Sequence, residues 1–403
     1  MSPTTYPRRS VASLAALVFV AFGVSLYGMS VLLTKDAAGG DFSISLLSAG
    51  FGGAAIVAGV LAPRVGRFAD DHSVRGLMFV GALLGALAMI LFAASTEPWH
   101  VMVVFLALLG PATAMTLYEP AFVAIGQWVG SMRRNHAIAL LSLIGGLAGP
   151  VFLPLTGVLL NEFGWRSTAV ILGVIYGLAG VVAVAVFPRS KPIDGRTQPV
   201  PTVPWRRFVR ERKLLLITIA IVLVFASMNS MIFHRVAVFE EQGFEVQAIA
   251  VLAGLSGLLT FPGRYLMPHI AHRLQASVLF AVSGSGLIIS LVFAIIGNPA
   301  WVMVASFAFF GIAFGFMLPT RPVIMDGLYA GVDFGALMGK QWSIAAVVGG
   351  LMPWVVGATR DLTGSYTVPL TLLTLLMVVA IVAMTASTRA DGSGEGATDV
   401  PSS

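Results

Sequence analysis

The chain has 403 residues, of which 57% are hydrophobic and 10% charged, with a formal net charge of +6 and no cysteine. About 25% of the residues of an ordinary soluble domain are charged, and a soluble protein this poor in charge could not cover its surface with polar groups. These values exclude a soluble protein, disulfides and thiolate metal sites, and they predict that most of the chain has lipid as its solvent.

Apolar segments of bilayer-crossing length follow one another along the chain, a crossing of ~30 Å needing about 20 mostly apolar residues. The segment after Arg8 and Arg9 resembles a signal peptide, but no small-residue cleavage site follows its long apolar run, so we interpret it as the first span. The expected spans are 11–33, 44–66, 76–96, 101–127, 137–160, 168–188, 214–240, 246–268, 277–297, 301–325, 335–357 and 367–387. The sequence therefore predicts an all-α integral membrane protein with twelve transmembrane helices.

The 24 Lys and Arg residues are divided unevenly between the two sides that this count defines. Eighteen fall on the side of both termini, in loops or at the adjacent span ends, and three lie deeper within spans. The loops on the opposite side hold only Lys35, Arg166 and Arg360. Because cytoplasmic loops carry an excess of basic residues, we expect a multi-pass protein of the cell inner (plasma) membrane with both termini cytoplasmic.

One long linker divides the chain into two halves. The segment 189–213 is rich in proline, which argues against a packed domain, and it contains the basic stretch Trp205-Arg206-Arg207. We expect its basic residues to lie on anionic lipid head groups. The predicted domains are a six-helix bundle over 1–188, the cytoplasmic linker 189–213, a second bundle over 214–389 and a disordered tail over 390–403.

The two halves repeat one another at a shift of about 202 residues. Three short matches occur in the same order in each half. They pair Ala69-Asp70-Asp71 with Ala271-His272-Arg273, Glu119-Pro120 with Arg321-Pro322, and Gly145-Gly146-Leu147 with Gly349-Gly350-Leu351. The matches favour a duplicated six-helix unit, and two parallel halves around a midplane site suit a transporter that rocks.

The loop from Gly66 to Arg75 resembles the signature between the second and third spans of the major facilitator superfamily. It has a glycine, an aspartate four residues later and then basic residues, although Asp71 and Ser73 depart from the usual pattern. Three further stretches resemble the bacterial branch related to monocarboxylate, oxalate and cyanate-type carriers. These are Leu117-Tyr118-Glu119-Pro120-Ala121-Phe122, Gly149-Pro150 through Phe163-Gly164-Trp165-Arg166, and Gly335-Ala336-Leu337-Met338-Gly339. The resemblance implies a fold in which the first, fourth, seventh and tenth spans line a central cavity.

Two ionisable residues lie deep within spans, where each is costly and therefore a functional candidate. Glu119 in the fourth span and Arg321 in the tenth reach a similar depth, about 27–30 Å from the periplasmic start. In the functional interpretation, Arg321 binds a carboxylate and Glu119 binds and releases a proton. The alternative is a structural ion pair that closes one end of the cavity.

Five further residues are candidates for substrate binding: Tyr27, Tyr118, Asn229, His234 and Lys340. The tyrosines can donate hydrogen bonds to a carboxylate or merely pack between helices. His234 can titrate in the physiological range or be simply hydrated or hydrogen-bonded near its helix end. Lys340 either holds an anion or extends to the cytoplasmic interface, and Arg235 either has a functional role or, as we expect, extends outward from its span.

Three loop-proximal residues are expected to act in gating. Asp70 suits the positive end of the third span, and by resemblance it latches the halves on the inside together with Arg75. Arg264 belongs to the equivalent network of the second half. The alternative for all three is a plain contribution to membrane topology.

The sequence has neither a Walker-type phosphate loop nor an H-E-x-x-H zinc motif, so we expect no enzyme, no cofactor and no metal. The first hypothesis is a monomeric, proton-coupled symporter of a small organic anion, whose partners are that substrate, protons and the lipid bilayer, with no nucleic acid. The second is a proton-driven drug or metabolite exporter of the same superfamily. The third is a membrane sensor or scaffold that does not transport.

Overall fold

The computed structural model describes residues 8–34, 37–71, 73–129, 131–188, 204–271, 274–329 and 334–389. Every regular element in these ranges is a helix. The linker residues 189–203 and the tail 390–403 lie outside the described residues, so the predictions made for them stay predictions.

The first half of the chain begins with short helical pieces and ends with one very long helix. Its elements are α1 (Arg8–Phe22), η1 (Gly23–Gly28), α2 (Met29–Leu32), α3 (Ala38–Asp41), α4 (Ile44–Asp71), α5 (Val74–Ala93), α6 (Pro98–Val104), η2 (Phe105–Leu109), α7 (Gly110–Thr116), α8 (Tyr118–Trp128), α9 (Ser131–Gly146) and α10 (Ala148–Val186).

The second half opens with a short helix and continues mostly with long ones. Its elements are α11 (Trp205–Arg210), α12 (Arg212–Glu241), α13 (Val246–Leu258), α14 (Thr260–Ala271), α15 (Ala276–Ile296), α16 (Ala300–Tyr329), α17 (Phe334–Thr363) and α18 (Thr367–Arg389).

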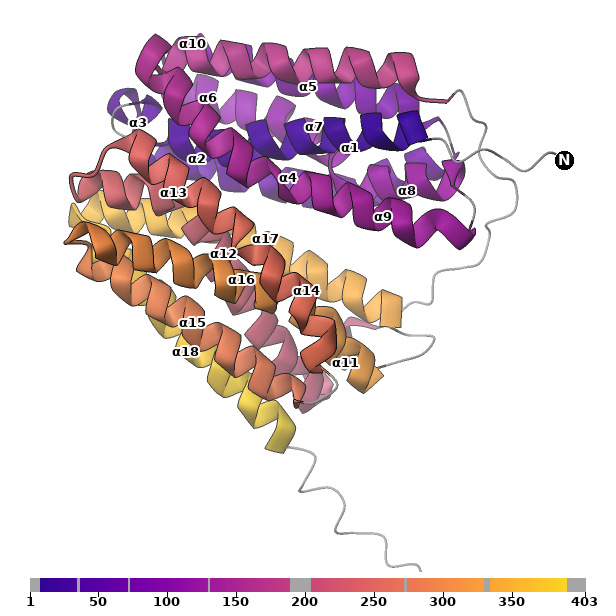
Figure 1. Ribbon diagram of the computed structural model, residues 1–403, viewed down its shortest axis with the longest axis vertical. Coiled ribbons are helices and arrows are strands. Elements are labelled where there is room, and N and C mark those ends of the chain that lie inside the picture. Colours follow the sequence, from indigo (N-terminus) through magenta and orange to yellow (C-terminus); the bar gives the residue numbers. More distant parts are fainter. Residues whose placement is uncertain are drawn as a thin grey trace, which may run out of the picture. The chain divides into compact units, whose positions relative to one another are not determined.

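Eleven segments of the described chain are long and apolar enough to cross a membrane. One of them, Leu140–Val186, has 47 residues, more than twice the length that one crossing requires. Gly164 divides it, because its φ of 71° and ψ of 170° are not helical, and Figure 1 shows α10 turning back on itself. Only glycine adopts such a conformation without strain. With this turn the segment supplies two crossings, and the predicted total of twelve is reached.

Three spans are interrupted three residues before a proline. The interruptions fall at Leu117, Leu147 and Leu259, and the prolines are Pro120, Pro150 and Pro262. Proline lacks an N–H group and its ring clashes with the carbonyl four residues earlier, so the preceding turn loses its helical hydrogen bonding. At Leu117 the backbone is extended, which places a break immediately before Tyr118 and Glu119.

The described helices form two compact units that do not follow the two halves of the chain. The first unit combines Met1–Thr197 with Ser230–Leu258 and Gly350–Tyr366. The second combines Gln198–Asn229, Leu259–Gly349 and Thr367–Ser403. One end of α12, all of α13 and one end of α17 therefore pack with the first-half helices.

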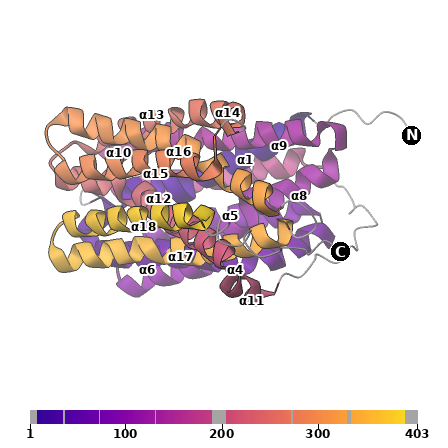
Figure 2. The same cartoon turned by 90° about the horizontal axis from the view of Figure 1, so that it is seen from below.

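Each unit has its own helix packing. In the first, α10 contacts α5, α1 and α13, and the buried Tyr176 hydroxyl lies 2.7 Å from Thr116 Oγ1. In the second, α15 lies between α16 and α18, as Figures 1 and 2 show. There Ser290 and Ser306 each donate a 2.9 Å hydrogen bond to the other's backbone carbonyl. Such reciprocal bonds hold neighbouring helices together where no water competes.

Candidate functional site

Arg235 and Arg321 lie within the long helices α12 and α16, one in each unit. Arg235 of α12 is buried, with 3% of its surface exposed, and Arg321 of α16 is half-buried. A guanidinium stays charged in proteins, and a charge within a span is costly, so such residues mark functional sites. The outward extension expected of Arg235 is not what the structure shows, because protein surrounds the side chain.

Arg321 is held in a fixed orientation by residues of α17. Its Nε donates a 3.0 Å hydrogen bond to Gln341 Oε1, and its guanidinium carbon lies 5.1 Å from the centre of the Trp342 ring. Gln341 is fully buried, and its amide donates in turn to Thr218 Oγ1 at 3.3 Å and toward Met325 Sδ at 3.7 Å. These contacts fix the plane of the Arg321 guanidinium, and the bond to Gln341 uses one of its five N–H donors.

Arg235 lies in the first unit, where it interacts electrostatically with Tyr27. Tyr27 belongs to the π-helical turn Gly23–Gly28, and single π turns inside α-helices occur frequently at functional sites. The Tyr27 ring packs against Gly149 of α10, where a Cβ would come within 3.1 Å of the ring. The first unit therefore contains a buried guanidinium and a phenol hydroxyl that interact electrostatically.

Tyr118 begins α8 directly after the helix break. Its ring stacks on Phe122 with centroids 5.4 Å apart and lies 4.9 Å from the Phe22 ring. Its hydroxyl faces Gly145, where a Cβ would lie 2.6 Å from the oxygen. Glu119 follows in the same helix, and its side chain lies outside the described part of the structure.

His234 is buried, with 1% of its surface exposed, and both ring nitrogens face protein atoms. Nε2 lies 2.9 Å from the Pro353 carbonyl oxygen, which only accepts, so this nitrogen carries the proton. Ser48 Oγ, 3.4 Å from Nε2, already donates to the Ile44 carbonyl and offers lone pairs as well. Nδ1 of the neutral ring then accepts from the Tyr366 hydroxyl at 3.1 Å.

Tyr366 connects His234 to a set of charged residues. Its backbone N–H donates to Glu241 Oε1 at 3.0 Å, and Arg360 holds the other oxygen of Glu241 through Nε and Nη2, both at 2.9 Å. Arg360 also contacts Asp361 at 3.3 Å, and Asp361 accepts from the Ser45 backbone N–H at 2.7 Å. We call these residues, together with His234, the His234–Arg360 network. Burial raises the pKa of the Tyr366 hydroxyl well above its usual range, so the group remains a donor.

The His234–Arg360 network joins three helix ends that are far apart in sequence: the start of α4, the end of α12 and the end of α17. Small residues allow the same helices to approach closely. A Cβ on Gly52 of α4 would overlap the Gly350 carbonyl oxygen of α17. A second crossing joins α10 to α13, where Asn161 donates to Gln247 at 2.8 Å. Helices of the first half are therefore joined to helices of the second at this end of the first unit.

Asn229 and Lys340, predicted to bind substrate, lie in the second unit. Asn229 donates a 2.8 Å hydrogen bond to the Gly349 carbonyl, which is the carbonyl that Pro353 leaves without its helical partner. Lys340 is half-buried in α17, one residue before Gln341. The structure thus gives Asn229 a helix-pairing contact and places Lys340 next to the residue that holds Arg321.

The predicted gating residues occupy helix ends in both units. Asp70 ends α4, with its side chain outside the described part of the structure, and Arg75 is half-buried at the start of α5. Arg264 of α14 is half-buried and lies 5.7 Å from the centre of the Phe261 ring. The searched part of the chain contains no cluster of three or more His, Asp or Glu suited to a metal ion.

Sequence reasoning missed the residues that surround the predicted ones. Gln341 and Trp342 had no assigned role, and Glu241, Arg360 and Tyr366 were loop or helix-end residues. The available signal was two pairs of adjacent charged residues, Glu240-Glu241 and Arg360-Asp361, at the ends of two spans. Their partnership depends on which helix ends meet, which the sequence alone does not state.

Many apolar helices of membrane-crossing length define a multi-pass membrane protein. The chain belongs to the Major Facilitator Superfamily, whose family profile matches residues 11–339. This membership makes the protein a transporter and not an enzyme.

Curated relatives and solved structures agree with this assignment. Monocarboxylate transporter 13 of Bos taurus is 23% identical over 300 residues, covering 73% of this chain and 68% of that protein. Monocarboxylate transporter 11 of Homo sapiens is 23% identical over 312 residues, covering 74% and 65%. The crystal structure of the nucleoside transporter NupG superimposes with a TM-score of 0.78 at 15% identity, covering 96% of this chain and 99% of that one. An inward-facing, unoccupied bacterial homologue of the human lysosomal transporter Spinster gives 0.76 at 13% identity, covering 96% and 98%. At these identities the solved structures show the fold alone.

Proposed function

We propose that the protein carries a small organic anion, of the size of a monocarboxylate, together with a proton across the inner (plasma) membrane by alternating access. The observation that carries this proposal is the presence of a guanidinium group within a membrane-crossing helix of each unit, at Arg235 and Arg321. The names of the relatives, which are monocarboxylate transporters, support the same class of substrate.

The proposed anion site uses the chemistry of the arginine fork. A guanidinium binds a carboxylate through two parallel N–H donors, and a fixed plane lowers the entropy lost on binding. Gln341 and Trp342 supply that fixed plane for Arg321. In the first unit, Tyr27 interacts electrostatically with Arg235 and offers a hydroxyl that can donate a hydrogen bond to an anion bound there. Lys340 adds a further positive charge to the second unit, one residue before Gln341.

Glu119 is the proposed proton site. It follows a helix break, and discontinuous helices form the ion and substrate sites of many transporters. A carboxyl that loses water binds a proton more tightly, so a change of access at Glu119 would alternately load and release the proton. Moving one proton with one carboxylate keeps the transported pair neutral and allows the pH gradient to drive accumulation.

Gating is proposed at both ends of the helices. The excess of basic residues on one side supports a cytoplasmic location for both termini, which would put the His234–Arg360 network at the periplasmic end. In that position His234 serves the periplasmic gate, because both of its ring nitrogens are engaged with protein atoms. Asp70, Arg75 and Arg264 form the cytoplasmic gate in this scheme, and a monomer suffices for the cycle.

Transport by purified protein in liposomes tests the proposal. With an inward proton gradient we expect uphill uptake of at least one member of a panel of radiolabelled monocarboxylates. Arg321→Gln should abolish uptake, whereas Arg166→Gln, which removes an equal charge from the exposed Arg166–Asp41 pair, should retain it. Absence of uptake for every acid, with uptake of organic cations instead, would replace the proposal by the exporter.

The exporter is favoured by one observation, the stack of Tyr118 on Phe122, since aromatic faces attract cations. Substrate added outside proteoliposomes distinguishes the two: symport carries a proton in with the entering anion and acidifies the lumen, whereas antiport exchanges the entering solute for a lumenal proton and makes the lumen more alkaline. A sensor or scaffold would give neither signal and no flux in liposomes.

A further inference from the structure

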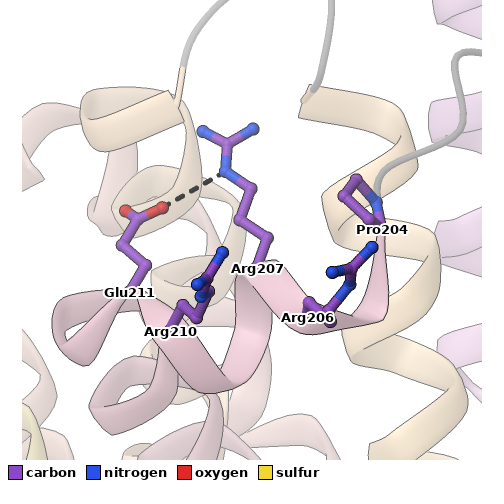
Figure 3. A pocket seen from close by; sticks show the side chains of 5 residues that line it. All are labelled: Pro204, Arg206, Arg207, Arg210 and Glu211. Carbon is purple, nitrogen blue, oxygen red and sulfur yellow. Dashed lines mark hydrogen bonds and ion pairs between the residues drawn. The ribbon is translucent and has the colours of Figure 1, made fainter.

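The short helix α11 presents three arginines around one surface hollow. The hollow has a volume of about 400 Å³ and is lined by Pro204, Arg206, Arg207, Arg210 and Glu211, as Figure 3 shows. All five residues belong to the second unit. One carboxylate faces three guanidinium groups here, so the lining carries a net positive charge of two.

The single carboxylate is already used. Arg207 Nε donates to Glu211 at 3.2 Å, one helical turn apart (Figure 3). Arg206 and Arg210 are also four residues apart, so they share one face of the helix, where like charges repel. Both are exposed, and neither forms a hydrogen bond or ion pair with another residue of the described ranges. An anion placed between them would relieve this repulsion.

The two faces of α11 differ in polarity. Phe208 is 4% exposed and anchors the helix on the protein, whereas Val209, on the other side, is 73% exposed. The outward face therefore combines two guanidinium groups with an uncovered apolar side chain. This mixture suits the boundary between lipid head groups and acyl chains.

The position of α11 along the chain places it at that boundary. The backbone is extended at Glu211, and α12 begins at the next residue and runs for 30 residues. A helix of this length measures about 45 Å, roughly 15 Å more than the hydrocarbon layer. The first turn of α12, with Arg212 and Lys213, therefore lies among the head groups, and α11 lies directly beside it in sequence.

We propose that Arg206 and Arg210 bind the phosphate of an anionic phospholipid head group, with Val209 entering the upper acyl region. Guanidinium groups recognise phosphate oxygens through paired N–H donors. Each basic residue near the surface contributes enough attraction that two together predict a roughly 30-fold preference for anionic over zwitterionic lipid. This lipid site is independent of the transported substrate.

The absence of cysteine from the chain allows a direct test. A polarity-sensitive fluorophore is attached to Val209→Cys in the full-length protein in phosphatidylcholine nanodiscs. Brominated phosphatidylglycerol and brominated phosphatidylcholine are then compared as quenchers at equal low mole fractions. We expect the anionic quencher to act far more strongly, and Arg206→Gln with Arg210→Gln to make the two quenchers equal.

The matched control removes the same charge elsewhere on the chain, through Arg8→Gln with Arg9→Gln, and should leave the preference unchanged. If the test variant is not obtained folded, high salt applied to the labelled parent should abolish the preference by screening. Equal quenching by both lipids in the parent, or an equal loss in the control, would overturn the proposal. A change in the fluorescence of the Val209→Cys label that inorganic phosphate alone produces in pure phosphatidylcholine would also overturn it, since the site would then bind a soluble anion.

Discussion

The imidazole Nδ1 of His234 lies 3.1 Å from the hydroxyl oxygen of Tyr366. Through this contact a buried residue of α12 meets the residue that precedes α18, and Tyr366 in turn holds Glu241 and its partner Arg360. The His234–Tyr366 contact thus connects the buried part of α12 to the charged residues Glu241 and Arg360 at the same end of the first unit.

Removing the Tyr366 hydroxyl should loosen this end. Tyr366→Phe leaves the buried Nδ1 of His234 without its hydrogen-bond donor, which destabilises the closed arrangement of this end by about 1–3 kcal/mol. We expect faster labelling of Ser45→Cys by a membrane-impermeant maleimide. Tyr265→Phe, at a 73% exposed position, is the matched control. Unchanged labelling in Tyr366→Phe would show that the contact does not hold the end closed.

Two arginine–carboxylate pairs of the first unit, Arg360–Glu241 and Arg166–Asp41, should differ in their contribution to stability. The side chains of Arg360 and Glu241 are 15% and 17% exposed, whereas those of Arg166 and Asp41 are 48% and 43% exposed. Arg360→Gln leaves a largely buried carboxylate without its partner and should cost about 3 kcal/mol. Arg166→Gln should cost less than about 1 kcal/mol. Thermal unfolding in detergent measures both, and equal shifts in Tm would contradict the difference in burial.

The crossing of α4 and α17 should not tolerate a side chain. Gly52→Ala places a methyl group on the Gly350 carbonyl oxygen, so the helices must separate. We expect slow transport and increased labelling of Ser45→Cys. Gly76→Ala introduces the same change in α5 where no atom lies within 4 Å, and it should behave like the parent. Normal transport by Gly52→Ala would mean that the crossing can widen without consequence.

The orientation of Arg321 should depend on Gln341. Gln341→Leu keeps the volume but removes the acceptor for Arg321 Nε, and a hydrogen bond to a charged group contributes about 1.5–3 kcal/mol. In the proposed carrier this raises the KM for the anion by roughly 10- to 100-fold with a smaller effect on kcat. Gln275→Leu, at an exposed helix cap, is the control. An unchanged KM would separate Arg321 from substrate binding.

The sequence predicted the twelve crossings and the family because both depend on local patterns of apolar residues, glycines and prolines. The breaks at Leu117, Leu147 and Leu259 each lie three residues before a proline that is visible in the sequence, at Pro120, Pro150 and Pro262. These breaks could have been predicted.

Side-chain partners could not be predicted in the same way. Arg235 was expected to extend outward. Its depth in the span does not say which face of the helix meets protein, so its burial could not be predicted. The partnership of Glu241 with Arg360 joins residues 119 positions apart in the chain, and it exists only because the ends of α12 and α17 meet. The proposed roles of Glu119 and Arg321 stay predictions.

The central claim, coupling of anion movement to a proton at Glu119, is tested most directly by comparing two modes of transport in one set of proteoliposomes. Parent and Glu119→Gln are assayed for uphill uptake of a labelled monocarboxylate under an inward proton gradient and for exchange against the same acid at equal pH. We predict that Glu119→Gln loses uphill uptake and retains exchange. Retention of uphill uptake, or loss of both modes, would contradict the account.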